Sequence, residues 1–288
     1  MTGSSGLAYK AYEIEELADI YFFRRLGYIV AHAARLIQLT PTAVSIAAAL
    51  VGVAGGALLY WPRLALVGFG LLVLHGVVDS ADGQLARMTN NTSELGRILD
   101  GVSGYVTHVA IFVAVALASM AAGASGSILL WAAAAGVSAA MQAQMYDYHR
   151  DSYARCVIRG TLGAQRSEAA AQSSSGMRAV LQRLAVIYGA LQRRLAGVHP
   201  EVEEALRRRA HSGQVRAEDR ARYRASYYWP VRGWNVLGDN VRRYAVGILA
   251  LMQQLDWLFA FILIPMNVLL CLLWLWQYRS DRRFLAGL

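Results

Sequence analysis

Three aspartates lie close together at the ends of two apolar stretches: Asp79 and Asp82 in the first, and Asp100 at the start of the second. A spacing of three places Asp79 and Asp82 on one side of a helix. A helical hairpin would bring Asp100 beside them, near one membrane face. Ionisable residues in such stretches are rare and indicate function. Three hard oxygen ligands suit Mg²⁺, Mn²⁺ or Ca²⁺. The plainer alternative is a hairpin whose aspartates only pair with arginines.

Two neighbours of the second aspartate suggest phosphate chemistry. Gly83 carries no side chain, so a bulky ligand could approach the backbone there. Arg87 lies one helical turn further on and could neutralise a phosphate. A divalent ion beside an arginine is typical of metal-assisted phosphoryl transfer. The site would then hold one ion or two.

The spacing of this segment resembles the signature of a known family. Residues 79–100 read D-SA-D-G-QL-AR-MTNNTSEL-G-RIL-D. This resembles the signature of the CDP-alcohol phosphotransferase family, with seven fixed positions present: Asp79, Asp82, Gly83, Ala86, Arg87, Gly96 and Asp100. Residues 40–45 (TPTAVS) also resemble the family's entry to its first span, with Thr42 where an Asn is usual.

The resemblance implies an activity and roles for these residues. Members of this family move a phosphoalcohol group between a CDP carrier, such as CDP-diacylglycerol, and an alcohol, and release CMP. They commonly act as homodimers in phospholipid synthesis. By resemblance, the three aspartates would hold Mg²⁺ or Mn²⁺ on the diphosphate. The nucleotide pocket would be formed by Gly83, Ala86, Arg87, Gly96, Thr42 and Ser45.

The chain departs from the family at Gly104, where a fourth aspartate, the presumed general base, is usual. Loss of a positioned base typically costs a factor of about 10²–10⁴ in rate. Three interpretations stay open. Another group, such as His108 one turn further on, or activation at the metal could replace the base. An anionic acceptor could attack without a base. The chain could instead be a pseudoenzyme or scaffold that only binds CDP-lipid.

The elements that position these residues are predicted to be membrane helices. The chain is 56% apolar and 16% charged, which disfavours a soluble enzyme and a disordered chain. Apolar runs predict an all-helical, polytopic protein with a non-cleaved N-terminus. The six expected spans are 42–61, 64–86, 97–121, 126–147, 234–254 and 257–278. Residues 11–35 are expected to form an amphipathic helix on the membrane surface.

The charge is concentrated in one loop. Residues 149–232 carry 16 arginines and 7 acidic residues, which equals the net charge of +9, and the remainder balances at zero. Because basic loops stay in the cytoplasm, the loop, both termini and the active site are expected to face the cytoplasm, in a bacterial inner membrane. Attraction to anionic lipid is a second role for this charge. No nucleic-acid-binding motif accompanies it.

Four segments follow along the chain: a surface segment (1–35), spans one to four with the motif 79–104 (36–148), the basic loop (149–232), and spans five and six with a cytosolic tail (233–288). Polar side chains at the end of span four could bind the acceptor or form an ordinary interfacial belt; they are Tyr148, His149, Arg150 and Arg155. The small residues of 132–140 would allow close helix contact, within one subunit or across a homodimer.

Overall fold

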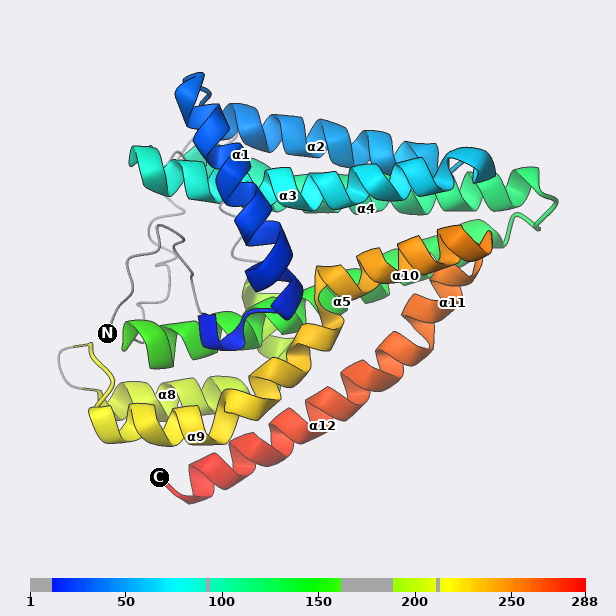
Figure 1. Cartoon of the computed structure of the whole chain (residues 1–288). Coiled ribbons are helices and arrows are strands. Elements are labelled where there is room, and N and C mark those ends of the chain that lie inside the picture. Colours follow the sequence, from blue (N-terminus) through cyan, green and yellow to red (C-terminus); the bar gives the residue numbers. More distant parts are fainter. Residues whose placement is uncertain (1–11, 92–93, 162–188, 211–212) are drawn as a thin grey trace, which may run out of the picture. The chain divides into compact units, whose positions relative to one another are not determined.

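The computed structural model describes residues 12–91, 94–161, 189–210 and 213–288 (Figure 1). These residues form helices, and the described part of the chain contains no strand beyond one bridge between Thr161 and Gln214. The prediction of an all-helical protein is therefore confirmed. The chain divides into two compact units, Met1–Ala140 with Asp239–Asn267, and Met141–Gly238 with Val268–Leu288. Each unit combines segments that are distant in the sequence.

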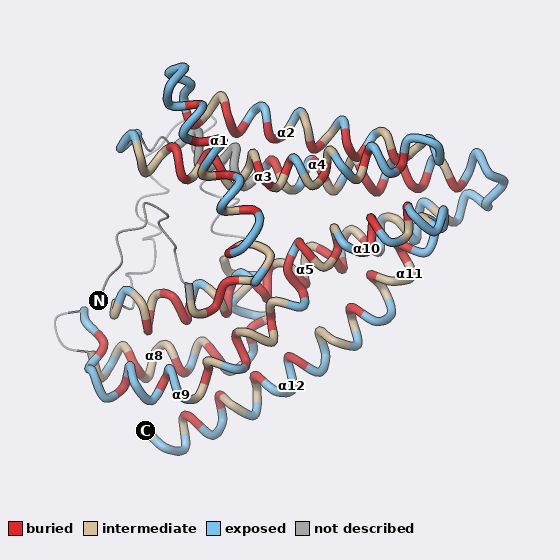
Figure 2. The backbone as a smooth tube through the Cα atoms, viewed as in Figure 1, coloured by how far each residue is buried: buried red, intermediate tan, exposed pale blue. Residues whose placement is uncertain are grey.

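The first unit contains the motif. A π-helical turn at Asp19–Phe23 leads into the first helix of this unit. Its helices are α1 (Arg24–Leu36), α2 (Pro41–Leu58), α3 (Ala65–Thr89), α4 (Glu94–Ala121), the first half of α5 (Ile128–Tyr153), α10 (Asp239–Met252) and α11 (Trp257–Leu263). Their shared core includes Leu72, Ile111, Phe112, Leu258 and Ile262. Figure 2 shows buried positions recurring along one side of these helices.

The start of α2 explains the Thr-Pro pair in the sequence. Thr40 is the N-cap, and its hydroxyl accepts a hydrogen bond from the amide of Ala43 at 3.2 Å. Pro41 occupies the first helical position, where a missing amide proton costs nothing. The next helix, α3, ends at its C-terminus because Asn90 adopts a left-handed conformation with φ of 50°. The first part of the motif, Asp79 to Arg87, therefore lies in the last turns of α3, and the rest lies in α4.

Glycines bring α2, α3 and α4 into close contact. A Cβ on Gly55 would come 2.9 Å from the backbone oxygen of Gly68 in α3. A Cβ on Gly56 would come 2.9 Å from the backbone nitrogen of Ile111 in α4. A Cβ on Gly52 would come 2.2 Å from the hydroxyl of Thr107. Small residues therefore allow the backbones of these helices to touch, as is common in membrane bundles.

The second unit contains the end of α5 and a π-helical turn at Ala154–Arg159. It also contains α8 (His199–Arg209), α9 (Ala217–Trp234) and most of α12 (Pro265–Ala286). Its largest fully buried side chains are aromatic and include Trp234, Tyr153, Tyr223 and Tyr227. Much of the basic loop predicted at 149–232 therefore belongs to this helical unit. The described residues do not cover 162–188, which include part of that loop.

Five helical segments of the described residues are long and apolar enough to cross a membrane. They are Pro41–Leu58, Pro62–Thr89, Val102–Ala121, Ile128–Arg159 and Trp257–Ala286. These match five of the six predicted spans, and the chain is an integral membrane protein. The predicted span 234–254 is not confirmed. Residues Asn235–Gly238 interrupt it, and α10 has 14 residues, or about 21 Å against a bilayer core of about 30 Å.

The N-terminal segment is helical over part of the predicted range 11–35. The described structure has the turn Asp19–Phe23 followed by α1. Large apolar side chains on this segment are exposed; they include Leu17, Tyr21, Leu26 and Ile29. Such a face is compatible with a membrane surface, and a surface location stays a prediction.

Candidate active site

Asp82 is oriented by a serine from another helix. Its side chain is 5% exposed, and the hydroxyl of Ser45 in α2 donates a hydrogen bond to its Oδ2 at 2.5 Å. The Ser45 hydroxyl also lies 3.1 Å from the carbonyl of Pro41, in the first turn of α2. Ser45 was expected to bind nucleotide, and the structure places it on an expected metal ligand. Thr42, expected to bind nucleotide as well, is half-buried in the same turn.

Asp79 and Asp82 provide two of the three expected metal ligands. Asp79 is half-buried and lies three residues before Asp82 in α3, on the same side of the helix. Asp100 and Gly96 lie in α4, but their environments fall outside the described residues. Among described side chains, no group of three His, Cys, Asp or Glu residues is arranged to hold a metal. The structure therefore covers only part of the expected site.

The last turns of α3 keep one side open beside Asp82. Within the described residues, the side chain nearest to a Cβ on Gly83 would be that of Arg87, with Nη1 at 3.5 Å. Arg87 and Ala86 are half-buried. The Ala86 carbonyl accepts the amide of Asn90, which ends the helix. A ligand at Gly83 would therefore meet helix backbone and a guanidinium group together.

Helix α1 fixes the motif helix from a second side. The side-chain amide of Gln84, buried in α3, donates to the carbonyl of Arg24 at 3.0 Å. A Cβ on Gly27 would come 2.9 Å from the hydroxyl of Ser80. Arg24 in turn forms an ion pair with the buried Glu15 at 2.5 Å. The polar residues between the motif positions were the only local signal for these contacts.

Gly104 faces open space. A Cβ there would meet no atom of the described residues within 4 Å. His108 lies one turn further along α4. Its Nδ1 is 2.8 Å from the Gly104 carbonyl, and its Nε2 is 2.9 Å from Oδ1 of Asp239 in α10. Both ring nitrogens face acceptors, which a doubly protonated ring satisfies. In this geometry neither nitrogen has a free lone pair to accept a proton. The geometry therefore does not support a base role for His108, which stays a prediction.

The start of α10 contributes charged groups that the sequence did not connect with the site. Nη2 of Arg243 donates to Oδ2 of Asp239 at 2.7 Å. The neighbouring Asn240 donates to Oε2 of Glu16 at 2.7 Å and to Oδ1 of Asp19 at 3.0 Å. These contacts tie α10 to α4 and to the N-terminal segment. The only sequence signal for these contacts was the presence of charged residues near the start of the predicted span 234–254.

The expected acceptor residues belong to the second unit, where they have partners inside that unit. Nη1 of Arg150 donates to the Tyr146 hydroxyl at 2.7 Å. Nη2 of Arg155 donates to Oε1 of Glu203 at 2.8 Å. His149 is buried and stacks on Trp234, with ring centroids 4.7 Å apart. Tyr148 is buried as well. Their role in acceptor binding stays a prediction.

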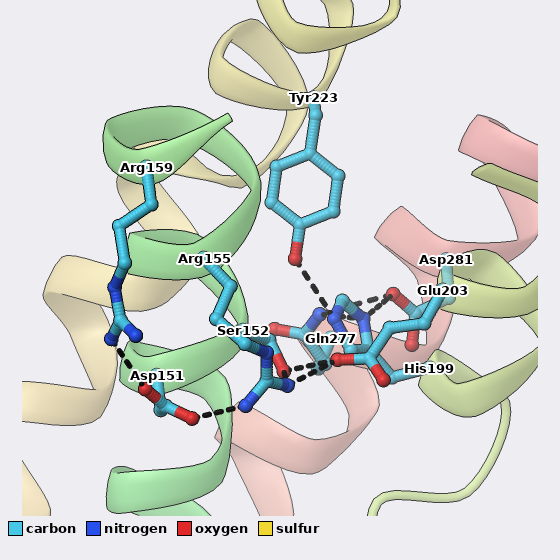
Figure 3. Close-up of polar contacts among 9 residues, drawn as sticks. All are labelled: Asp151, Ser152, Arg155, Arg159, His199, Glu203, Tyr223, Gln277 and Asp281. Atoms are coloured by element: carbon cyan, nitrogen blue, oxygen red, sulfur yellow. Dashed lines mark hydrogen bonds and ion pairs between the residues drawn. The ribbon is translucent and has the colours of Figure 1, made fainter. Parts of the chain in front are cut away.

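A buried polar cluster links α8, α9 and α12 in the same unit (Figure 3). Nδ1 of His199 lies 2.8 Å from Oδ1 of Asp281, and its Nε2 lies 2.9 Å from the Tyr223 hydroxyl. Gln277 donates to Asp281 at 3.0 Å. Burial raises the pKa of Tyr223 well above its ordinary value, so its hydroxyl keeps its proton and can donate to His199. No motif in the sequence indicates this cluster, because its residues come from three segments that are distant along the chain.

Comparison with known proteins agrees with the motif. The family model described as CDP-alcohol phosphatidyltransferase matches residues 38–196, which is more than half of the chain. No curated protein and no solved structure matched the chain. The matched range contains α2, α3, α4 and α5, and with them every expected metal and nucleotide residue. The chain therefore belongs to the CDP-alcohol phosphatidyltransferase family.

Proposed function

We propose that this protein transfers a phosphoalcohol group from a CDP-linked substrate, CDP-diacylglycerol or a similar CDP-alcohol, to an acceptor, and releases CMP. An acceptor oxygen forms a new bond to the phosphorus that carries the alcohol, and the bond from that phosphorus to CMP breaks. The observation that carries the proposal is the pair Asp79 and Asp82 in the family motif, with Ser45 donating to Asp82. The acceptor is an alcohol or an anionic group.

The three aspartates of the motif, two in α3 and one in α4, have the donor chemistry of a divalent-ion site. Asp79, Asp82 and Asp100 would hold Mg²⁺ or Mn²⁺, as one ion or two, because all three offer hard oxygen ligands. When bound, the metal supplies positive charge against the diphosphate. Ser45 has the place of an outer hydrogen-bond donor, which orients a ligating carboxylate and keeps it ionised. The 2.5 Å contact between buried groups supports that role.

The other motif residues would shape the nucleotide pocket. Gly83 leaves the helix backbone open to the CDP group, and Ala86 keeps the next turn narrow. Arg87 lies against the same side and would pair with a phosphate oxygen. Gly96 and Thr42 complete the proposed pocket. Tyr148, His149, Arg150 and Arg155 are proposed for the acceptor on the strength of their position after span four in the sequence.

The protein is proposed to work at the cytoplasmic side of a bacterial inner membrane, as a homodimer. The basic residues of 149–232 support a cytoplasmic position of that segment and an attraction to anionic lipid. The small residues of 132–140 support close contact between helices, including contact across a dimer. A lipid substrate and a water-soluble partner can meet at such an interface.

A second candidate is a protein that binds CDP-lipid without turning it over. Two observations favour it. Position 104 carries no carboxylate, and both ring nitrogens of His108 are occupied by the Gly104 carbonyl and Asp239. Nucleotide binding would then persist, because the other motif positions are present.

The two candidates are separated by measuring CMP release from purified protein with Mg²⁺ or Mn²⁺, across CDP-lipids and acceptors. The transferase proposal expects CMP release that Asp79→Asn abolishes. The control is Asp256→Asn, because Asp256 is an exposed acid in the turn between α10 and α11. Tight cytidine nucleotide binding without CMP release by the unmodified protein would favour the binding-only candidate.

A further inference from the structure

A small cavity with a mixed polar and apolar lining lies between α3, α4, α10 and α11, next to the motif. Its volume is about 20 Å³, enough for one water-sized group. Its polar lining consists of His75, Thr107, His108, Asp239, Arg242 and Arg243. His75 lies one helical turn before Asp79, and His108 lies one turn after Gly104. The cavity therefore lies about one helical turn from the motif residues, along both α3 and α4.

The cavity contains polar groups that a hydroxyl or a water could satisfy. The Thr107 side chain is 3% exposed, and its hydroxyl has no hydrogen-bond partner among the described residues. A buried hydroxyl without a partner is costly unless another molecule supplies one. The neighbouring His75 uses Nδ1 on the Ala48 carbonyl at 2.9 Å. The lining thus combines a free hydroxyl with charged groups on α10.

Asp239 is the carboxylate of this lining, and it is both fixed and reachable. His108 Nε2 lies 2.9 Å from one oxygen and Arg243 Nη2 lies 2.7 Å from the other. Arg242 adds a third basic group, with Nη1 4.0 Å from Oδ1, and together these partners hold the group as a carboxylate in one orientation. Its side chain is nevertheless 48% exposed, so an incoming group can contact it. It is connected to Gly104 through only one side chain, that of His108.

We propose that Asp239 supplies, from α10, the carboxylate that position 104 lacks, and that it contacts the attacking hydroxyl of a neutral alcohol acceptor. This inference rests on the proposed transferase function. As the acceptor oxygen bonds to phosphorus and the bond to CMP breaks, Asp239 accepts a hydrogen bond from the attacking hydroxyl, and the hydroxyl proton passes to water. The open side of Gly104 leaves room for the acceptor, and His108 and Arg243 position the carboxylate.

The test compares four proteins: the unmodified chain, Asp239→Asn, the double variant Asp239→Asn with Gly104→Asp, and the control Asp256→Asn. CMP release with Mn²⁺ and a panel of alcohols gives kcat, and titration with CMP gives nucleotide binding. Asp239→Asn keeps the shape of the side chain and is expected to lower kcat by about 10- to 100-fold, the loss of a hydrogen bond to a charged group, with CMP binding retained. The double variant is expected to recover at least tenfold, because Gly104 has space for a side chain.

Three results would overturn the inference while leaving the transferase function intact. The first is an unchanged kcat in Asp239→Asn. The second is a parallel loss of CMP binding, which would make the residue structural. The third is a double variant no more active than Asp239→Asn. No CMP release by the unmodified chain with any alcohol of the panel would overturn this inference, and no CMP release with anionic acceptors as well would overturn the proposed function.

Discussion

Removal of the Ser45 hydroxyl should weaken metal binding without removing any expected ligand. In Ser45→Ala, Asp82 loses a hydrogen bond of 2.5 Å between groups that are 3% and 5% exposed. A hydrogen bond to a charged group contributes about 1.5–3 kcal/mol, which corresponds to roughly 10- to 100-fold in affinity. Loss of an outer hydrogen bond to a metal ligand has a similar effect, about 10- to 100-fold.

The assay is a Mn²⁺ titration of the purified protein by electron paramagnetic resonance, with the metal dependence of CMP release as a second readout. The matched control is Ser119→Ala, because Ser119 is also buried but donates only to the carbonyl of Val115, at 2.9 Å. Ser45→Ala should raise the Mn²⁺ dissociation constant and Ser119→Ala should not. Equal Mn²⁺ affinity in Ser45→Ala and the unmodified protein would refute the assigned role of this hydroxyl.

Three further predictions concern packing, the second unit and the metal. Gly52→Ala should lower the free energy of unfolding by about 1–3 kcal/mol, because its Cβ would come 2.2 Å from the Thr107 hydroxyl. The control Gly70→Ala should not destabilise the protein, since no described atom lies within 4 Å of the added Cβ. Thermal unfolding in detergent measures both. His199→Ala should cost about 1–3 kcal/mol, because Asp281 loses its hydrogen bond to His199 and keeps the one from Gln277 described above, and His199→Gln should cost less, by the same measurement. Chelation with EDTA should abolish CMP release, and Mn²⁺ should restore it; activity that persists in EDTA would contradict a metal site.

Much of the motif region could be read from the sequence because its geometry is local. Residues 40–45 resemble the family's entry to its first span, and in the structure a helix begins there, with Thr40 as N-cap and Pro41 at the first helical position. Spacing alone places Asp79 and Asp82 on one side of α3. Long apolar runs predict membrane-spanning helices, because a backbone in lipid must satisfy its hydrogen bonds internally. Five of the six predicted spans are present among the described residues.

The contacts that refine the site depend on segments that meet only after folding. Ser45 and Asp82 are 37 residues apart, and no local pattern connects them. The contact between His108 and Asp239 joins α4 to a helix more than a hundred residues later. The predicted span 234–254 was not confirmed, because the backbone at Gly238 is extended and separates α9 from α10. Hydropathy measures how apolar a segment is and does not detect such a break.

The glycine contacts of α2 have a consequence for how the site can move. Where helix backbones touch, as at Gly55 and Gly68, no side chain remains between them to change rotamer and absorb a shift. Displacing α2 or α3 alone would separate the Ser45 hydroxyl from Asp82. We therefore expect this pair of helices to respond to substrate as one stiff body. Opening for a lipid would have to come from elements attached by side chains, such as α10. Substitutions at lipid-facing positions would leave the arrangement of Ser45 and Asp82 unchanged. A single methyl group added at Gly55 would disturb it.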